Sequence, residues 1–270
     1  MKKETVNIAA VMVRYNSDLN RSATYLTLFK DLECPKLIYD NSFTKIKANP
    51  IADFNYHHDP ENGGVSKAYN YAAKWALSLN CSHLLLLDSD SEFPKNAFSK
   101  YRNAAEESAE KIILPSMLSE NKVISPFYFR FGKSWYGDSI NFGTINLGKI
   151  VAINSGMLIP LSTFQEVNGF NEQLPLDWSD VDFCRKLAKI KTQAQYINLV
   201  INHSLSDHQK SDFASAKYRY KTYFKGVKEL PESFLEKLSL LYWAKLKAIK
   251  LSFIYKNPWF IIYYLKHWYD

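Results

Sequence analysis

The chain has 270 residues, enough for one large α/β domain, and its 47% hydrophobic and 23% charged residues are typical of a folded globular protein. Three scattered cysteines without a CxxC pair argue against a disulfide framework or a zinc ribbon and favour a reducing compartment. The net charge is +7, and no apolar run is long enough to span a bilayer.

Apolar runs and turn signals predict strands that alternate with helices in the first part of the chain. The expected strands are residues 6–13, 36–39, 55–58 and 84–87, and the expected helices are residues 19–32 and 65–79. This alternation predicts parallel strands in a doubly wound sheet with helices on both faces.

The second half of the chain is less regular. We expect a strand at 111–115, a strand or hairpin at 127–135, a strand with a central glycine at 151–159, a helix at 180–189 and a last strand at 195–201. A glycine inside a strand often marks the close approach of a ligand or of another backbone segment. From residue 211 onward, long basic and aromatic helices are expected, interrupted by Pro231 and Pro258.

The most informative stretch is a run of four leucines followed by Asp88, Ser89 and Asp90. It places two carboxylates directly after a buried strand, at the edge of the sheet where open α/β folds bind ligands. Two hard oxygen donors there suit a divalent cation, which can hold a substrate diphosphate. A solvated turn is the other interpretation, because Asp and Ser are common in turns.

Further polar clusters follow other predicted strands or occupy loops, and a parallel sheet would bring them to the same edge. They are Tyr15-Asn16, Asp40-Asn41-Ser42 and Asn62-Gly63-Gly64. Gly63 and Gly64 permit a close approach of the backbone to a ligand. Lys67 could meet a phosphate, although an ordinary solvent-facing lysine is the simpler interpretation.

A second acidic group lies at residues 177–182, where a predicted helix begins. The helix dipole stabilises carboxylates at that end, and one that faces a cleft could act as a general base on a hydroxyl. Capping of the helix alone is the alternative. His203 follows the last predicted strand and is a candidate metal ligand.

Taken in order, these parts resemble a family 2 glycosyltransferase with the GT-A fold, over about residues 6–207. The matching parts are Tyr15-Asn16, Asp40-Asn41-Ser42, Asn62-Gly63-Gly64 with Asn70, the DXD motif Asp88-Ser89-Asp90, residues 154–159 and 169–172 on the acceptor side, and Asp180-Val181-Asp182 with Arg185. Residues 177–180 and 203–207 are most similar to rhamnosyltransferases and next to galactofuranosyltransferases. The chain departs from the family where Ser179 replaces the first acid of a common Glu-Asp pair, and where Ala72 replaces a glycine.

The resemblance implies an inverting, metal-dependent hexosyltransferase of cell-surface polysaccharide synthesis. It would move rhamnose from a dTDP- or UDP-sugar to a saccharide or lipid-linked saccharide, with galactofuranose or another hexose as the alternative. Asp180 is then the general base, and Mn²⁺ or Mg²⁺ is held by Asp88, Asp90 and His203. The implied donor-binding residues are Tyr15, Asn16, Asp40, Asn62, Gly64, Lys67, Asp88 and Ser89, and the implied acceptor-side residues are Gly156, Asp177 and Trp178.

We expect a mostly parallel, Rossmann-like catalytic domain at residues 1–210, with nucleotide-sugar binding in about 1–115 and the acceptor side in about 116–210, followed by a helical tail at 211–270. Lysines among Trp, Tyr and Leu suit a tail that lies on an anionic membrane surface. Packing against the catalytic domain or in a homodimer is the alternative. Residues 1–5 lead into strand-like sequence without the apolar region of a signal peptide, so we expect a cytoplasmic protein with peripheral membrane contact.

Two other classes of protein fit these motifs less well. A metal-dependent phosphohydrolase also places DxD after a strand, but it leaves Asp40 and Asn62 without a role. A non-catalytic protein would bind a membrane through its basic tail, but a cluster of carboxylates is costly without a cation. Neither GxGxxG nor GxxxxGK[ST] occurs, so dinucleotide-binding and P-loop folds are unsupported, and no nucleic-acid partner is expected.

Overall fold

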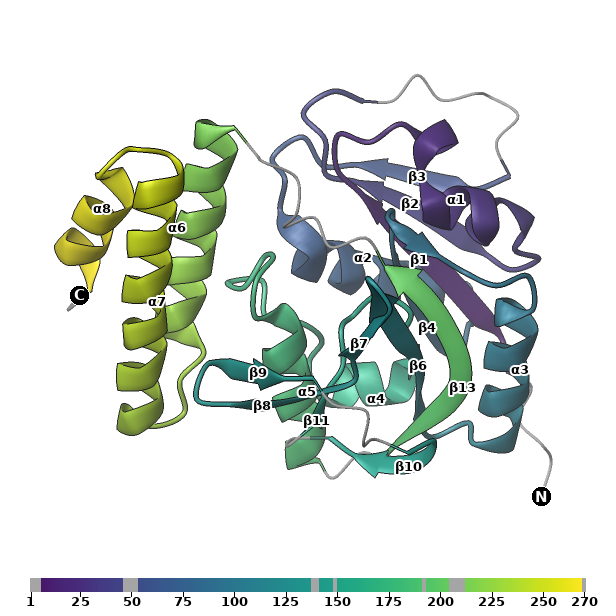
Figure 1. Ribbon diagram of the computed structural model, residues 1–270. Coiled ribbons are helices and arrows are strands. Elements are labelled where there is room, and N and C mark those ends of the chain that lie inside the picture. Colours follow the sequence, from purple (N-terminus) through teal and green to yellow (C-terminus); the bar gives the residue numbers. More distant parts are fainter. Residues whose placement is uncertain are drawn as a thin grey trace.

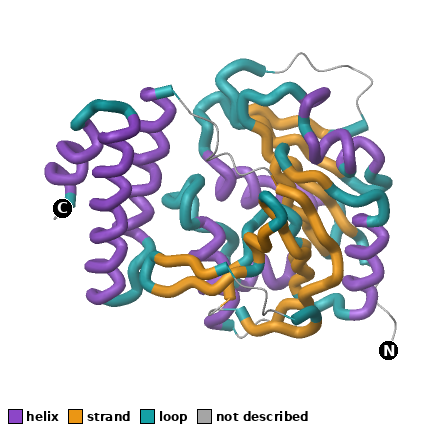
Figure 2. The backbone as a smooth tube through the Cα atoms, viewed as in Figure 1, coloured by secondary structure: helices purple, strands orange, loops and turns teal. Residues whose placement is uncertain are grey.

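The computed structural model describes residues 6–45, 53–136, 141–147, 150–190, 193–203 and 212–268. A large, mostly parallel sheet forms the centre, with helices on both faces and a group of C-terminal helices at one side (Figures 1 and 2). The α/β fold class and the helical C-terminal region that the sequence predicts are therefore confirmed.

The main sheet has ten strands in the order β10-β13-β6-β12-β4-β1-β2-β3, with β5 paired to β13 and β7 to β6. Its strands are β1 (Ile8–Arg14), β2 (Lys36–Asp40), β3 (Asn55–His58), β4 (His83–Asp88), β5 (Ser91–Glu92), β6 (Ile112–Ser119), β7 (Lys122–Ser125), β10 (Gly143–Asn146), β12 (Leu158–Pro160) and β13 (Gln193–His203). Strands β1 to β4 are parallel, so their carboxyl ends meet at one edge. A second sheet contains β8 (Phe127–Arg130), β9 (Lys133–Trp135) and β11 (Ile150–Val151).

The helices are α1 (Ala23–Thr27), α2 (Gly64–Ser78), α3 (Ala97–Glu107), α4 (Leu161–Glu166), α5 (Ser179–Lys189), α6 (Phe213–Glu229), α7 (Phe234–Ile254) and α8 (Trp259–His267), with short 3₁₀ turns η1 (Leu19–Arg21) and η2 (Phe29–Asp31). The single helix predicted at 19–32 is wrong, because the chain forms η1, α1 and η2 there. Ser22 caps α1 through Tyr25 N and also bonds the Ser89 carbonyl. Such side-chain bonds to the backbone compete with a continuous helix.

The single strand predicted at 151–159 is also wrong. The chain leaves the small sheet after β11 and enters the main sheet at β12, with a turn between them. Gly156 lies in that turn at φ +81°, and its N–H bonds the Leu86 carbonyl at 2.7 Å. The glycine thus permits a close approach, but to a neighbouring strand of the same chain.

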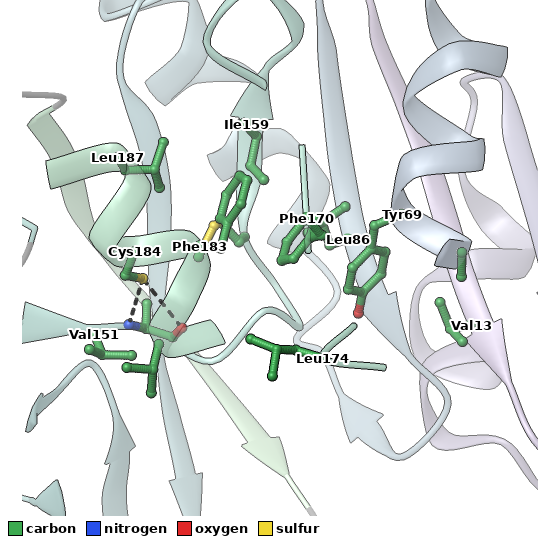
Figure 3. Packing of buried hydrophobic residues seen from close by; sticks show 14 of the residues in the cluster. Val13, Tyr69, Leu86, Val151, Ile159, Phe170, Leu174, Phe183, Cys184 and Leu187 are labelled. Carbon is green, nitrogen blue, oxygen red and sulfur yellow. Dashed lines mark hydrogen bonds between the residues drawn. The ribbon is translucent and has the colours of Figure 1, made fainter. Parts of the chain in front are cut away.

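Both faces of the main sheet are buried, and β1 shows the pattern. Its alternate residues face two hydrophobic clusters, with Ala9, Val11 and Val13 on one side and Ile8, Ala10 and Met12 on the other. Within the first cluster, Phe170 stacks on Phe183 of α5 with ring centroids 4.0 Å apart (Figure 3). The backbone of Ala152 bonds Cys184 beside them (Figure 3).

The C-terminal helices belong to the same first cluster as the sheet, because Tyr220, Phe224 and Leu240 are buried in it. The domain boundary expected at residue 210 stays an interpretation of the sequence, and it falls within residues 204–211, which lie outside the described part. The first hydrophobic cluster contains residues from both sides of this boundary. Among the helices of the described residues, none is long and apolar enough to cross a membrane.

Because the C-terminal helices share a hydrophobic core with the sheet, we predict that the two unfold together. Phe224 is almost fully buried against the rings of Tyr220, Tyr263 and Tyr264, so Phe224→Ala should lower the free energy of unfolding by about 3–5 kcal/mol. Denaturation followed by circular dichroism should still show one transition, whereas Tyr218→Ala, on the exposed side of the same helix, should change stability little. A separate transition that moves alone would contradict a shared core.

Candidate active site

Asp88 ends β4 at the carboxyl edge of the parallel strands, next to Val13 of β1. Its N–H donates to Ser155 Oγ at 3.0 Å, and its carboxylate accepts a 2.9 Å hydrogen bond from the hydroxyl of Tyr69 on α2. Burial raises the pKa of Asp88 to about 6, and the charge of Asp90 adds to this shift. The carboxylate is thus held in a place where its ionised form is disfavoured.

Asp180 lies in the first turn of α5, and its carboxylate accepts a 2.8 Å bond from the Val181 N–H. Burial raises the pKa of Asp180 to about 6, with smaller contributions from the charges of Asp177 and Asp88. The charges of Asp88, Asp90 and Asp180 all act on the buried hydroxyl of Tyr69 and help to raise its pKa. The two acidic groups of the sequence therefore converge on one place.

Asp90 and His203 are the other two residues expected, with Asp88, at the metal site. His203 ends β13, where it pairs with Ser91, and its Nδ1 lies 2.9 Å from Ser91 Oγ and 3.6 Å from Asp90 Oδ1. That Asp90 oxygen is buried and accepts no hydrogen bond, and burial raises the pKa of Asp90. Asp90 and His203 are donors that suit a divalent cation.

The described residues contain no group of three or more His, Cys, Asp or Glu side chains arranged to hold a metal ion. The expected trio of Asp88, Asp90 and His203 is therefore present only as the Asp90–His203 pair, with the Asp88 carboxylate bonded to Tyr69. Mg²⁺ sites commonly take one or two carboxylates from the protein and complete their shell with water and substrate phosphates. The buried Asp90 oxygen, which accepts no hydrogen bond, fits that use.

Asp40, expected at the nucleotide base, is fully buried at the end of β2. Its carboxylate accepts bonds from Arg14 Nη1 at 2.5 Å, Tyr56 OH at 2.6 Å, and both N and Oγ of Ser42. Burial alone would raise the pKa of Asp40, but the bonds from Ser42 and Tyr56, with the charge of Arg14, hold it below its ordinary value. The carboxylate holds the ends of β1 and β2 together, so a direct ligand contact would require this network to open.

The loop held by this network presents aromatic side chains. Tyr15 is 47% exposed, and its ring lies edge-on to the exposed ring of Phe43, 6.1 Å away. Asn16, at φ +48°, donates its N–H to Ser42 Oγ. Because base-sized rings stack on exposed aromatic faces, Tyr15 and Phe43 are suited to line a nucleobase site; Phe43 was not expected from the sequence.

The glycine loop before α2 approaches the protein itself. Gly64 is buried at φ +83°, and a Cβ there would lie 2.1 Å from the carbonyl oxygen of Pro175, which accepts the Val65 N–H. This part of the loop therefore contacts the segment that leads into α5, and the approach of Gly64 to a ligand stays a prediction. Asn62 lies at φ +52° in this loop, partly exposed.

Lys67, expected at a phosphate, pairs with Asp59 at 2.9 Å while its side chain is 41% exposed. Asp59 is buried and also accepts bonds from Tyr39 OH and the Gly63 N–H. Lys67 thus holds the glycine loop, and it reaches a phosphate only if it leaves Asp59. The sequence contained no signal for Asp59, which follows a weak strand.

Asn70 of α2 joins two motifs that the sequence shows 100 residues apart. Its side chain accepts from Phe170 N at 2.8 Å and donates to the Phe170 carbonyl and to Glu172. Tyr69, the neighbouring residue, carries the hydroxyl that bonds Asp88. Tyr69 was not expected to be functional, because at the spacing of a helical core face it looks like an ordinary packing residue.

Of the residues expected on the acceptor side, Gly156 is buried, and Asp177 and Trp178 lie in the loop before α5. A Cβ at Gly156 would lie 2.8 Å from Pro115 and 3.1 Å from Ile201, so the surroundings of this glycine are side chains of the protein. Trp178 adopts φ +70° before α5 and packs its ring on Tyr223 of α6, donating its Nε1–H to the Tyr223 carbonyl at 3.2 Å. In this position Trp178 anchors the Asp177–Asp180 loop, and its contact with an acceptor stays a prediction; Asp177 is partly exposed.

Comparison with known proteins identifies the fold. No family model matches the sequence. The structure resembles GalNAc-T7 solved with UDP, GalNAc and Mn²⁺, at 12% identity and a TM-score of 0.58, over 96% of this chain and 56% of that one. It also resembles residues 1–349 of TarS from S. aureus in complex with UDP-GlcNAc, at 15% identity and a TM-score of 0.52, over 87% of this chain and 70% of that one.

In sequence, the chain is similar to the dTDP-rhamnosyl transferase RfbF of Shigella flexneri, with 25% identity over 185 residues. The match covers 66% of this chain and 62% of that protein, so the chain spans less than two thirds of the relative's length. These findings confirm the predicted resemblance: the chain has the GT-A fold of glycosyltransferases, and a rhamnosyl transferase is among the proteins it resembles.

The anchor of Trp178 predicts the effect of one added methyl group. A Cβ at Gly226 of α6 would lie 2.3 Å from Trp178 Cδ1. Inside a helix, Gly→Ala normally stabilises by about 1 kcal/mol, but overpacking here should make Gly226→Ala destabilising by about 1–3 kcal/mol. Thermal and denaturant unfolding would measure the sign, with Glu229→Ala on the exposed side of α6 as the control. A more stable Gly226→Ala protein would contradict the anchor.

Proposed function

We propose that this protein is an inverting, metal-dependent glycosyltransferase that moves a sugar from a nucleotide-diphosphate donor to a saccharide acceptor. The observation that carries the proposal is the convergence of Asp88, Asp90 and Asp180 around Tyr69 at the carboxyl edge of a GT-A sheet. In such sheets ligands bind at that edge, and desolvated carboxylates with raised pKa values mark sites of chemistry.

The donor half of the proposed site lies at the ends of β1, β2 and β4. Tyr15 and Asn16 line the nucleobase side, with Asp40 acting through Arg14 and Tyr56 as a positioning residue. Asn62, Gly64 and Lys67 shape the loop on the other side, and Ser89 with Asp88 borders the ribose and the diphosphate.

Asp90 and His203 would hold a divalent cation, Mn²⁺ or Mg²⁺, with Asp88 close by. When bound, such an ion neutralises the charge that develops on the leaving nucleoside diphosphate. The fit rests on the buried Asp90 oxygen that accepts no hydrogen bond and on its proximity to His203 Nδ1. That GalNAc-T7 was solved with UDP and Mn²⁺ adds support from the fold.

Asp180 is the proposed general base. With a pKa of about 6 it is mostly ionised at neutral pH, yet basic enough to accept a proton. It takes the proton of the acceptor hydroxyl as that oxygen attacks the anomeric carbon. The diphosphate leaves from the opposite face of the sugar, which inverts the configuration. Asp177 lies on the same loop and borders the acceptor side.

The proposed sugar is rhamnose from a dTDP-sugar, because the curated relative is a dTDP-rhamnosyl transferase. A hexose from a UDP-sugar is the alternative, since TarS was solved with UDP-GlcNAc and GalNAc-T7 with UDP and GalNAc. Galactofuranose stays open from the sequence motifs. We further propose a cytoplasmic enzyme of cell-surface polysaccharide synthesis, with a saccharide or lipid-linked saccharide as acceptor.

The role of Asp180 predicts a defined kinetic loss. Asp180→Asn should lower kcat by about 10² or more and leave donor affinity nearly unchanged, because general-base help is worth about 10²–10⁴-fold. The wild-type kcat/KM should fall as the pH drops below about 6, to about a tenth of its plateau one pH unit lower, because Asp180 becomes protonated.

Two matched variants test whether Asp180, rather than a neighbouring carboxylate, is the general base. Asp182→Asn, whose carboxylate faces Lys186, and Asp177→Asn remove the same charge from the same segment. If either of them loses kcat while Asp180→Asn does not, the base is assigned wrongly. Release of phosphate without sugar transfer would instead indicate a phosphohydrolase.

The proposed cation contact gives a second test. Asp90→Ala should abolish the Mn²⁺-dependent part of nucleoside diphosphate affinity in calorimetry, because it removes the buried oxygen that accepts no hydrogen bond. Asp31→Ala, which removes an exposed carboxylate on η2, should bind as the wild type does. Equal Mn²⁺-dependent affinity in the two variants would remove Asp90 from the site.

A further inference from the structure

Helix α7 has apolar side chains on two opposite faces. One face carries Leu240, Leu241, Ala244 and Ala248, which are buried in the main core. The other carries Leu235, Leu238, Tyr242, Leu246 and Phe253, which are 68%, 47%, 56%, 37% and 79% exposed. These five are spaced by three, four, four and seven residues, so they form one stripe along the helix. We call them the outer stripe of α7.

The outer stripe extends along most of α7. From Leu235 to Phe253 the helix rises about 27 Å. Helices α6, α7 and α8 stand at one side of the molecule, with the β1–β3 half of the main sheet toward the other side (Figures 1 and 2). Helix α8 carries exposed Ile262, Leu265 and Trp268. A surface of this extent is larger than scattered exposed leucines would explain.

The charges around the stripe have one sign. Lys245 and Lys250 are exposed and flank it, one on each side by helical spacing. The only acidic residue of α7, Glu236, is buried and paired with Arg185. Residues 212–268 contain eleven Lys and Arg against four Asp and Glu, so this region carries the whole excess of +7.

From this pattern we propose that the outer stripe of α7, with Lys245 and Lys250, docks the protein on an anionic lipid bilayer. The helix lies in the interface with its axis along the membrane, the stripe enters the boundary of the acyl chains, and the lysines meet lipid phosphates. The opposite face of α7 stays packed in the core, so docking needs no refolding.

A second copy of the chain fits the same surface less well. A twofold interface would bury the stripe against itself and bring the lysines that flank it together, and α7 offers no exposed carboxylate to pair with them. Anionic lipid supplies the missing charge. The proposal does not depend on the transferase activity, because binding to vesicles requires neither donor nor acceptor.

Vesicle flotation tests the proposal with the full chain. The wild type should float with vesicles of phosphatidylcholine and phosphatidylglycerol at low salt, less at high salt, and not with phosphatidylcholine alone. Lys245→Gln with Lys250→Gln should lower the partition coefficient about 30-fold, which corresponds to about 2 kcal/mol. Leu238→Gln with Tyr242→Gln should also lower it, at unchanged charge.

Two double variants are the matched controls. Leu26→Gln with Leu79→Gln, and Lys30→Gln with Lys74→Gln, remove exposed leucines and lysines from other helices and turns and should bind vesicles as the wild type does. Melting temperatures verify that each variant folds. The proposal is overturned if the wild type does not float at low salt, or if the α7 variants float like the controls. It is also overturned if light scattering shows a wild-type dimer that Leu238→Gln with Tyr242→Gln makes monomeric.

Discussion

Desolvation of carboxylates at one sheet edge is the constraint around which the structure is arranged. Burial raises the pKa values of Asp88 and Asp180 to about 6, above the ordinary value near 3.8. For groups shifted in this direction, the contribution to stability is fully present below the ordinary pKa and is lost as the pH rises through about 6. At neutral pH the folded protein therefore carries a cost at this edge, which the sheet, α2 and α5 must outweigh.

The parts of the fold that lie in local sequence patterns could be predicted. Strand β3 was expected with its observed bounds, and β1, β2, β4, α2 and α5 within a few residues. Strands buried on both faces, such as β1 and β4, give continuous apolar runs that are visible in the sequence. Strand β5 and helix α4 were not expected, since each is short and is held by contacts with distant segments. The broken helix at 19–32 failed for a related reason: Ser22 bonds the backbone of Ser89, which no local pattern records.

The same limit applies to the candidate site. The sequence placed Asp88 and Asp90 at the carboxyl edge of the sheet, because a strand end is a local signal, and the family resemblance assigned Asp180 to the same site. It did not predict what the neighbouring side chains do. Asp40 pairs with Arg14 across β1 and β2, and Lys67 pairs with Asp59. Trp178 donates a hydrogen bond to the carbonyl of Tyr223, which lies 45 residues later in the chain. Each of these partners is brought near only by the tertiary structure.

The dependence of Trp178 on α6 also bears on the order in which the protein is made. A protein is synthesised from its N-terminus, so β1 to β4 leave the ribosome before α6 does, although they bury their apolar faces only with the later segments that share their core. The loop that carries Asp180 lacks its anchor at that time, because Tyr223 and Gly226, which Trp178 packs against, are synthesised later. The proposed proton acceptor would therefore reach its final position only after α6 has been made. Reactivity would then appear only after the last helices have docked, which keeps an unfinished chain from acting on its substrates.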